Sequence, residues 1–493
     1  MMNSTDQITK LSEVPWVSDL IAERLSASGD TTGIPYYHYR WKKKWLADYV
    51  AWPESSEEVS QIIQFASKKK IPIIPRGGGT CYYGSASPTR GGIVIDTKRM
   101  DKLKEVNKDD GWIIVEAGAV WEILNNDLSK HGLAIPSAPQ SGVASTLAGW
   151  LAIGGSAGVG TPKYGSMIEN VLEMEVVRPD GTIDTVTGED MKPFFGTSGI
   201  AGVVTTIKMK VIPIPEEIQG FMFAFDDLHK AVDALSRLSK TKTQPVYLRL
   251  TDLEYEWRIQ GGLPPGTSGL FFVMVTYGGP ADEVAESMKT ARGIFEVAGG
   301  EEMQQDYYNK NWEDRNIVEM KLKLEVPTLS MQNFWIPIQH IEPIVRKMYK
   351  IASNYHINSC FYCVLGSSSM ARLCVFAPSD HRHWMHFMSG KSMLHKLVKM
   401  MYRRGGRLYT LGLQNTVYIK KYQPEDYKRY KELRKTWDPK GIMNPDKLTH
   451  CVMSYTRLNL MFTMNGNFRR LQALLRRAKK ILQIPVSYQE GSF

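Results

Sequence analysis

The 493-residue sequence lacks the features that would place it in a membrane or a secreted class. It contains no run of about 18 or more apolar residues, so no transmembrane helix is expected. Residues 1–6 lack the basic start and the apolar core of a signal peptide, which favours a cytoplasmic protein. Cysteine is scarce and odd in number at five, which excludes a disulfide framework and fits a reducing compartment.

Motifs for metal ions, iron–sulfur clusters and nucleic acids are missing as well. Cys360 and Cys363 form a single C-x-x-C in an apolar stretch, without a second pair at zinc-like spacing, so we predict a buried strand and no metal site. No cysteine array of the iron–sulfur type is present. The net charge of +10 lies largely in the last third and accompanies no nucleic-acid motif, so we expect a basic face for an acidic protein or a lipid surface.

A glycine-rich loop between two short strands is the most informative stretch that the sequence does contain. It reads I-P-I-I-P-R-G-G-G-T-C-Y-Y-G-S-A-S-P-T-R-G-G-I-V-I-D over residues 71–96. Three consecutive glycines have no Cβ atoms and tolerate positive φ, so their amide groups can converge on an anion, with Arg76 and Thr80 beside them. The spacing matches neither G-x-G-x-x-G nor the P-loop. We therefore expect the loop to bind a diphosphate.

The surrounding sequence predicts a β–α–β unit and two further segments rich in small residues. Residues 52–59, W-P-E-S-S-E-E-V, predict a strand end, a helix N-cap and an acidic first turn, and apolar residues from Val59 to Ala66 recur on one side of the helix that follows. The second segment, residues 139–165, reads P-Q-S-G-V-A-S-T-L-A-G-W-L-A-I-G-G-S-A-G-V-G-T-P-K-Y-G, a composition that lets the backbone approach a flat ligand. The third segment, F-G-T-S-G-I-A-G-V-V-T, covers residues 195–205.

The order of these segments resembles the FAD-binding module of the vanillyl-alcohol oxidase flavoproteins, also called the p-cresol methylhydroxylase type. Relatives that bind FAD covalently through the glycine loop carry a His where this sequence has Thr80, whose hydroxyl cannot form that bond. We expect non-covalent FAD, unless a Tyr or His of the second domain is the anchor. The resemblance implies FAD-binding roles for Pro75, Arg76, Gly77, Gly78, Gly79, Thr80, Cys81, Gly84, Ser85, Pro139, Ser141, Thr146, Leu147, Gly149, Trp150, Gly154, Gly155, Ser156, Tyr164, Gly165, Gly202, Val203, Val204 and Asn444.

The resemblance also predicts an α+β fold of several parts. The cap should hold an antiparallel sheet with helices on one face, because strands expected over 247–252, 271–277 and 334–337 alternate with helices over 281–298 and 340–355. A further helix should begin at an N-cap at 379–380. We expect a helical extension (1–45), a two-part FAD-binding domain of p-cresol methylhydroxylase type (46–215), a cap or substrate domain (216–436), a return to the FAD domain (437–450) and a basic C-terminal extension (451–493).

The tail W-D-P-K-G-I-M-N-P-D-K-L, residues 437–448, agrees best with the branch of the family that contains glycolate oxidase and D-lactate dehydrogenase. In that branch an Arg that follows a Trp shortly before a strand implies a cation for the substrate carboxylate. Arg315 is the first candidate for this role, and Lys321 or Lys323 is the second.

Two departures from that branch concern its metal ligands and its catalytic His. The matching stretches here read L-G-S-S-S-M-A-R (365–372) and L-Y-T-L-G (408–412), without His or Glu, so we expect no divalent metal. Arg372 and Tyr409 occupy these places instead. A Tyr beside an Arg can act as an acid or base if the cation lowers its pKa.

By resemblance, the protein is an FAD-dependent dehydrogenase that oxidises a small 2-hydroxy acid of the D-lactate or glycolate type by hydride transfer to flavin N5. Its electrons would pass to an iron–sulfur protein, an electron-transfer flavoprotein or a quinone. Three alternatives stay open. They are a phenol- or alcohol-oxidising enzyme of the vanillyl-alcohol oxidase group, an enzyme like alkyl-dihydroxyacetone-phosphate synthase, and an electron-transfer protein without its own substrate.

The C-terminal extension contains an amphipathic basic stretch over residues 467–482. Its apolar positions fall on one side of a helix and its Arg and Lys residues on the other. Such a helix suits an anionic membrane surface or an acidic partner, and packing on its own domain is the alternative. Membrane contact of this kind would make the protein peripheral at the inner face of the membrane.

Overall fold

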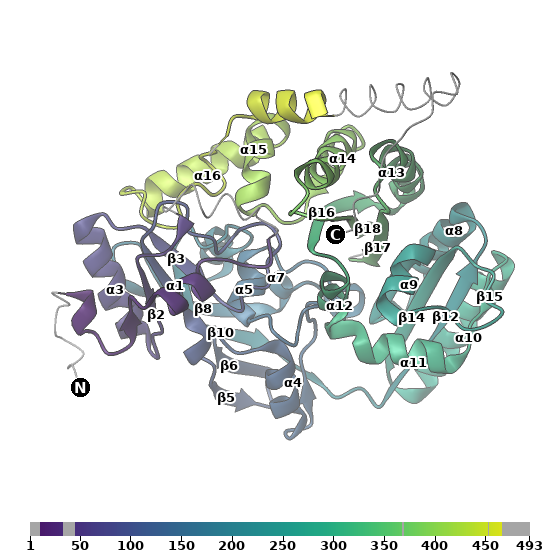
Figure 1. Ribbon diagram of the computed structural model, residues 1–493. Helices are drawn as coiled ribbons and strands as arrows, with labels where there is room; N and C mark the ends of the chain where they lie inside the picture. The colour runs from purple at the N-terminus through teal and green to yellow at the C-terminus, as the bar shows by residue number, and fades with distance from the viewer. Residues whose placement is uncertain (1–9, 33–44, 367–368, 452, 466–493) are drawn as a thin grey trace, which may run out of the picture.

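The computed structural model describes residues 10–32, 45–366, 369–451 and 453–465, and it contains three main sheets (Figure 1). The first has four strands in the order β1-β2-β4-β3, with β2, β4 and β3 parallel to one another. Helix α3 connects β2 to β3, and Ser55 is its N-cap, as predicted. The elements are β1 Val17–Ser18, α1 Ile21–Ala27, β2 Tyr49–Ala51, α3 Ser56–Lys69, β3 Ile73–Arg76 and β4 Ile93–Asp96.

The second sheet has five strands in the order β5-β6-β10-β8-β9, and all of its pairings are antiparallel. Its apolar face packs against α4 and α5 in a core that contains Trp121, Leu124 and Trp150. The elements are β5 Leu103–Asn107, β6 Trp112–Glu116, α4 Trp121–Ser129, α5 Leu147–Ala152, α6 Thr161–Tyr164, α7 Met167–Asn170, β8 Val171–Val177, β9 Ile183–Thr187 and β10 Val203–Lys210.

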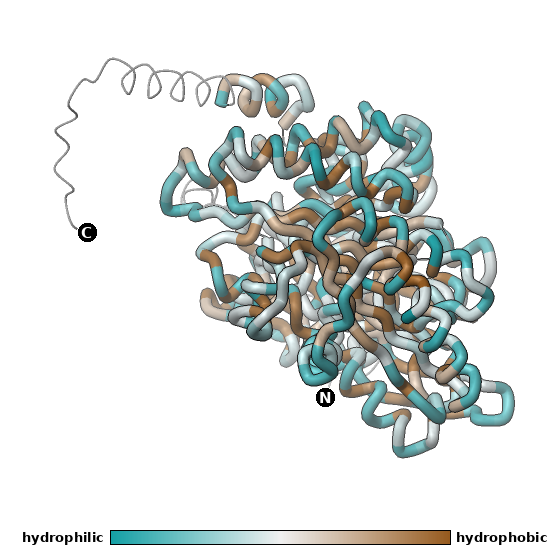
Figure 2. The backbone as a smooth tube through the Cα atoms, turned by 90° about the vertical axis from the view of Figure 1, so that its right-hand side faces the viewer, coloured by the Kyte–Doolittle hydropathy of each residue, from teal (hydrophilic) through white to brown (hydrophobic). Residues whose placement is uncertain are grey.

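The third sheet has eight antiparallel strands in the order β15-β12-β14-β13-β17-β18-β16-β19. Its strands are buried almost throughout, so apolar residues (brown in Figure 2) run through the middle of this part of the molecule. The strands are β12 Glu217–Phe225, β13 Tyr247–Asp252, β14 Phe271–Gly279, β15 Glu301–Glu302, β16 Thr328–Pro337, β17 Cys360–Leu365, β18 Met370–Ser379 and β19 Arg407–Leu408.

Helices cover both faces of this sheet, and the prediction of helices on one face was wrong. Strand β12 shows the reason, because Phe223 packs into the core on one face while Met222 packs into the core on the other. A strand that is apolar at successive positions needs cover on both sides. The outer face carries α8 Leu228–Leu238, α10 Ala281–Val297, α13 Ile341–Tyr355 and α14 Trp384–Tyr402, and the inner face carries α9 Leu253–Gln260, α11 Gln305–Glu313 and α12 Val318–Leu324.

Two further predictions about elements need correction. The described part of the N-terminal extension is not purely helical, because Val17 and Ser18 form strand β1 and extend the first sheet beside β2. The N-cap predicted at 379–380 is wrong, because Ser379 is the last residue of β18, opposite Thr328, and α14 begins only at Trp384. By contrast, the predicted buried strand at Cys360 and Cys363 is confirmed as β17.

The chain returns to the first sheet near its C-terminal end, after α15 Gly412–Tyr422 and α16 Pro424–Trp437. Ile73 donates its N–H to Ile442 and accepts a hydrogen bond from the N–H of Asn444. A last helix, residues 455–465, packs on α14, where Asn459 accepts a hydrogen bond from His395. The predicted membrane-surface stretch, 467–482, lies outside the described residues. Among the helices of the described ranges, none combines the length and apolar character that a membrane span requires.

Candidate functional site

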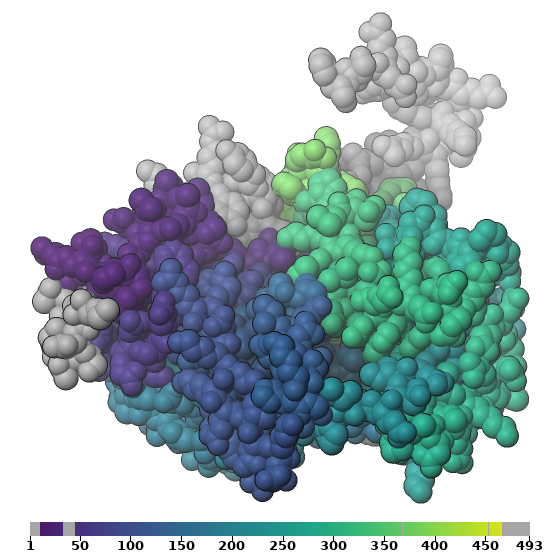
Figure 3. Space-filling model, turned by 90° about the horizontal axis from the view of Figure 1, so that it is seen from below, coloured from purple at the N-terminus to yellow at the C-terminus, as the bar shows by residue number. Residues whose placement is uncertain are grey.

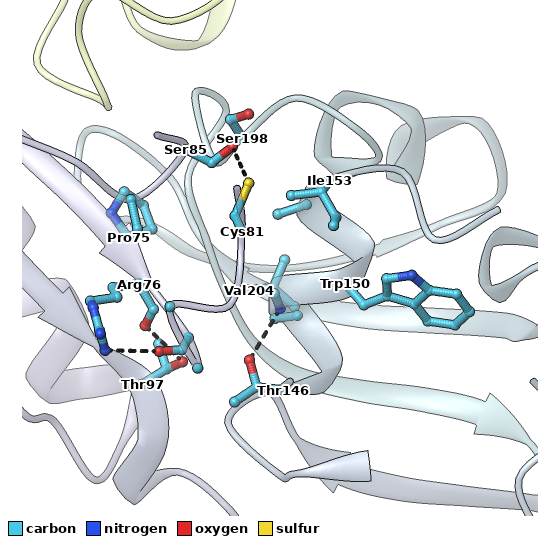
Figure 4. Close-up of a pocket in the computed structure, with 18 of the residues that line it drawn as sticks. Pro75, Arg76, Cys81, Ser85, Thr97, Thr146, Trp150, Ile153, Ser198 and Val204 are labelled. Atoms are coloured by element: carbon cyan, nitrogen blue, oxygen red, sulfur yellow. Dashed lines mark hydrogen bonds between the residues drawn. The ribbon is translucent and has the colours of Figure 1, made fainter. Parts of the chain in front are cut away.

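A cavity lies over the glycine loop, where β3 ends and the first two sheets meet (Figure 4). It takes residues from the glycine loop, from helix α5 and the loop before it, and from the third small-residue segment. The predicted cofactor residues that line it are Pro75, Arg76, Gly77, Gly78, Gly79, Thr80, Cys81, Ser85, Thr146, Gly149, Trp150, Gly202, Val203 and Val204. The sequence reasoning missed Ala86, Thr97, Ser145, Ala148, Ala152, Ile153, Phe194, Ser198 and Gly199, which also line it.

Glycine is required in this loop for two local reasons. A Cβ on Gly78 would overlap the carbonyl oxygen of Ala144, and Gly79 has a φ of +67°, which strains other residues. Arg76 stands beside the loop and donates to Asp96 at 2.8 Å, while its Nε is buried without a hydrogen-bond partner. The loop therefore offers open backbone and one unsatisfied cationic N–H to a ligand in this cavity.

The remaining predicted cofactor residues do not line this cavity, and several support its walls. Asn444 donates to the carbonyl oxygens of Ser85 and Ser198 at 2.8 and 2.6 Å, so it ties together two segments that do line it. The Ser141 and Ser145 hydroxyls lie 2.6 Å apart. The residues outside the lining are Gly84, Pro139, Ser141, Leu147, Gly154, Gly155, Ser156, Tyr164, Gly165 and Asn444.

Cys81 is the one thiol in the cavity wall. Its Sγ donates to the Ser85 hydroxyl at 3.3 Å. Burial, together with the nearby carboxylate of Asp30, raises the pKa of Cys81 to about 12. A thiol that stays protonated at neutral pH is a poor nucleophile. The geometry therefore gives Cys81 a hydrogen-bonding role at the wall.

Arg372 and Tyr409 are brought together on the inner face of the third sheet. The Arg372 guanidinium lies 5.2 Å from the centre of the Tyr409 ring. The Tyr409 hydroxyl accepts hydrogen bonds from the backbone N–H groups of Ser156 and Ala157, both at 3.2 Å. Tyr409 thereby fixes the glycine-rich end of the second small-residue segment.

Arg372 is buried in a polar cluster that the sequence did not reveal. Its Nη2 donates to Gln140 Oε1 and to the Tyr362 hydroxyl, and it lies 3.3 Å from Glu319 Oε1. Burial would lower the pKa of Arg372, but Tyr362 and Glu319 raise that pKa well above its usual value. The charge of Arg372 is thus permanent and is balanced by Glu319 within the protein.

Arg315 lies apart from this cluster, in a second cavity between α4 and the inner-face helices of the cap. Its guanidinium packs over Trp312 at 4.2 Å and donates to the Trp312 carbonyl oxygen at 2.7 Å. Burial lowers the pKa of Arg315, and Glu122 opposes that shift. Within the described part of the chain, no carboxylate forms an ion pair with Arg315. Tyr164 and Glu122 line the same cavity.

The two lysine candidates are placed differently. Lys321 forms an ion pair with Asp314 on the same short stretch. Lys323 is exposed on α12. The structure thus brings two of the four leading catalytic candidates together, Arg372 with Tyr409. Arg315 lines the second cavity, and Lys323 lies at the surface. No group of three His, Cys, Asp or Glu side chains suited to a metal ion occurs in the part of the chain that the structure describes.

Four polar residues at these sites were not predicted: Glu122, Gln140, Glu319 and Tyr362. Gln140 falls inside the P-Q-S segment, so its place beside the ligand loops was open to prediction. Glu319 is one carboxylate in a helix that also carries lysines, and nothing in its sequence neighbourhood distinguishes it from a surface residue.

Comparison with known families accounts for most of the chain. Residues 47–187 match the family described as FAD binding domain, and residues 214–448 match the family described as FAD linked oxidases, C-terminal domain. Together the two matches span well over half of the chain. They confirm the predicted FAD-binding domain, its cofactor FAD and the second, oxidase domain.

Three known proteins illustrate the similarity. Glycolate oxidase subunit GlcD of Bacillus subtilis is 25% identical over 465 residues, 90% of this chain and 96% of its own. D-lactate dehydrogenase of Archaeoglobus fulgidus is 27% identical over 419 residues, 80% of this chain and 90% of its own. A solved structure of alkyldihydroxyacetonephosphate synthase has a TM-score of 0.72 at 21% identity, and the match covers 91% of this chain and 87% of that one. The last likeness concerns the fold alone.

Proposed function

Because the chain belongs to the FAD-linked oxidases and is an FAD-dependent oxidoreductase, we propose that it oxidises a small 2-hydroxy acid of the D-lactate or glycolate type. Bound FAD supplies the acceptor for the two electrons of that oxidation. The residues that line the first cavity fit the cofactor, since a diphosphate needs converging N–H donors, and the open backbone of Gly77 to Gly79 and the unpaired Nε–H of Arg76 offer them. The charge of Arg76 itself is balanced by Asp96. A protein or quinone would take the electrons onward.

The observation that supports a carboxylic acid substrate is the state of Arg315. It is a cation at the wall of a cavity, and among the described residues it has no carboxylate partner. A half-buried guanidinium that forms no ion pair is a binding site for a carboxylate, which it can hold through two parallel N–H groups. Arg372 suits this role less well, because Glu319 already balances its charge.

The first test is an anaerobic titration of the purified yellow protein with D-lactate, glycolate and D-2-hydroxyglutarate, followed by the absorbance of the flavin. Loss of the oxidised flavin band with one D-acid, and not with its enantiomer, is the expected result. Failure of every acid to reduce a flavin that dithionite still reduces would reject the proposal. It would favour a phenol substrate, an electron-transfer protein, or an enzyme like the synthase above, in which the flavin takes part in the reaction without net oxidation of the substrate.

The role of Arg315 is tested separately with Arg315→Met. Charge-assisted hydrogen bonds contribute about 1.5–3 kcal/mol, so the dissociation constant of the acid should rise on the order of 10- to 100-fold. Arg292→Met is the control, because Arg292 lies on the outer-face helix α10 and pairs with Glu302 at 3.1 Å. We expect the control to bind the acid as the unaltered protein does. Equal affinity of the Arg315 variant would remove Arg315 from the binding site.

A further inference from the structure

The second cavity contains an acceptor as well as donors. Trp121 and Glu122 open helix α4 and line the cavity opposite Arg315. Glu122 Oε2 and Trp121 Nε1 are both buried without a hydrogen-bond partner. Trp121 is only 1% exposed. Buried polar groups are rarely left unpaired in proteins, so each of these is available to a ligand.

The first turn of α4 is held firmly against the FAD site. The backbone N–H of Glu122 donates to Gly142 at 3.2 Å, and that of Trp121 donates to Ser145 at 3.3 Å. Ser145 also lines the first cavity, on the other side of the same loop. The Trp121 ring packs edge-on against Trp150, another residue of that cavity, with 5.1 Å between ring centres. The two cavities therefore share a wall.

Glu122 and Arg315 influence each other electrostatically but form no ion pair. Both groups line the second cavity, and the carboxylate opposes the effect of burial on the pKa of Arg315. The pair leaves room for a ligand that carries a carboxylate for Arg315 and a hydrogen-bond donor for Glu122. A 2-hydroxy acid carries both groups on adjacent carbon atoms.

The other candidate acids and bases near the site are already engaged. The Glu319 carboxylate accepts a hydrogen bond from the Tyr362 hydroxyl and forms an ion pair with Arg372. The Tyr409 hydroxyl accepts two backbone N–H groups. The stretches 365–372 and 408–412 contribute no His or Glu. A base for the hydroxyl proton has to come from elsewhere in the described structure.

We infer that Glu122 is the base that removes the hydroxyl proton of the 2-hydroxy acid, an inference that rests on the function proposed above. The O–H bond breaks and its proton passes to the Glu122 carboxylate. FAD, when bound at the first cavity, would supply the acceptor for the C2–H hydrogen and its two electrons, so that C2 and its oxygen become the carbonyl of a 2-oxo acid. Arg315, with the Trp121 N–H, holds the carboxylate during this change.

The test compares Glu122→Gln with the unaltered holoenzyme. Gln keeps the shape and cannot take a proton, so flavin content should stay the same while the rate of flavin reduction by the acid falls on the order of 100-fold or more.

A second measurement does not depend on turnover. Oxalate, an unreactive analogue with a carboxylate for Arg315, should bind Glu122→Gln at least as tightly as the unaltered protein by calorimetry, because a nearby negative charge has been removed. Asp127→Asn is the matched control on α4, where Asp127 is exposed and pairs with Lys130. We expect it to behave as the unaltered protein in both measurements.

The outcomes separate the two proposals. Equal rates of flavin reduction for Glu122→Gln and the unaltered enzyme would overturn the role of Glu122 and leave the hydroxy-acid function standing. Loss of oxalate binding together with loss of rate would also overturn it, because the residue would then be needed for binding or folding. If no hydroxy acid reduces the unaltered enzyme, both proposals fail.

Discussion

At the scale of single residues, the glycine loop gives the sharpest prediction. Gly78→Ala introduces a Cβ that overlaps the carbonyl oxygen of Ala144, so the loop has to move away from the segment that also carries Ser145. Overpacking of this kind costs about 1–3 kcal/mol. We expect the affinity for FAD to fall on the order of tenfold or more, measured by titrating apoprotein with FAD.

The control for this prediction is Gly293→Ala on α10. A Cβ at Gly293 meets no atom within 4 Å, and its helical backbone suits alanine. The variant should keep its FAD affinity and gain up to about 1 kcal/mol of stability. Unchanged FAD affinity in Gly78→Ala would show that the loop does not approach the cofactor.

The cofactor residues could be predicted because they are close in sequence and use a distinctive residue type. Three glycines in a row also suit a flexible turn, so Gly77 to Gly79 became informative through the β–α–β unit around them and the two further segments rich in small residues. Glu122 could not be found in this way. An acidic residue in the first turn of a helix is common, because it interacts favourably with the helix dipole, and only the fold places it opposite Arg315.

At the scale of secondary structure, the junction of β13 and α9 depends on pH. Asp252 ends the strand and caps the helix. Its carboxylate accepts hydrogen bonds from the backbone N–H of Tyr255 at 2.9 Å and from the hydroxyl of Tyr349 at 2.7 Å. Burial raises the pKa of Asp252 to about 7. The folded state therefore binds a proton more tightly than the unfolded state, and stability falls as pH rises from about 4 to about 7.

Asp252→Asn removes this dependence, because Asn caps the helix without ionising. The stability of the variant relative to the unaltered protein should increase across this pH window, by up to about 4 kcal/mol above pH 7. Urea unfolding at a series of pH values measures it. A constant difference between the two proteins from pH 4 to 8 would mean that Asp252 titrates normally.

The strands of the cap were predictable and their environment was not. The strand over Tyr247–Asp252 agrees with its prediction to the residue. The sequence did not predict helices on both faces, because a short run of apolar residues has the same sequence pattern whether helices pack on one face of the sheet or on both. The inner-face helices matter most, because α12 brings Glu319 to Arg372.

At the scale of the whole molecule, the parts are unevenly charged. Figure 3 shows the FAD-binding part, purple to blue, meeting the green cap along one seam.

No Asp or Glu occurs from residue 381 to residue 424, a stretch with nine Lys or Arg. Tyr402 and Tyr422 stack 4.6 Å apart and bring the ends of α14 and α15 together. Burial lowers the pKa of Lys399, and repulsion from Lys421 and Arg403 lowers it further, so these three cations lie close to one another.

We expect this basic face to bind anionic vesicles at low salt. A basic residue near such a surface contributes about 1 kcal/mol of binding free energy. The double variant Arg403→Gln, Lys421→Gln should therefore bind the vesicles with roughly 30-fold lower affinity, measured by co-sedimentation. Lys230→Gln, Arg237→Gln is the control of equal charge, because both residues lie on α8 and pair with acidic neighbours. Equal loss in the two double variants would mean that only net charge matters.

The return of the chain to the first sheet has a consequence for how the protein is made. Asn444 joins Ser85 to Ser198, and Ile73 pairs with residues on either side of Met443, so the walls of the first cavity are completed by a segment that leaves the ribosome after the whole cap. A nascent chain that ends before Asn444 lacks the contacts of Asn444 with Ser85 and Ser198. We therefore expect the flavin to bind late in biogenesis, and a premature stop anywhere in the cap to leave an apoprotein fragment for proteolysis rather than a partly active enzyme.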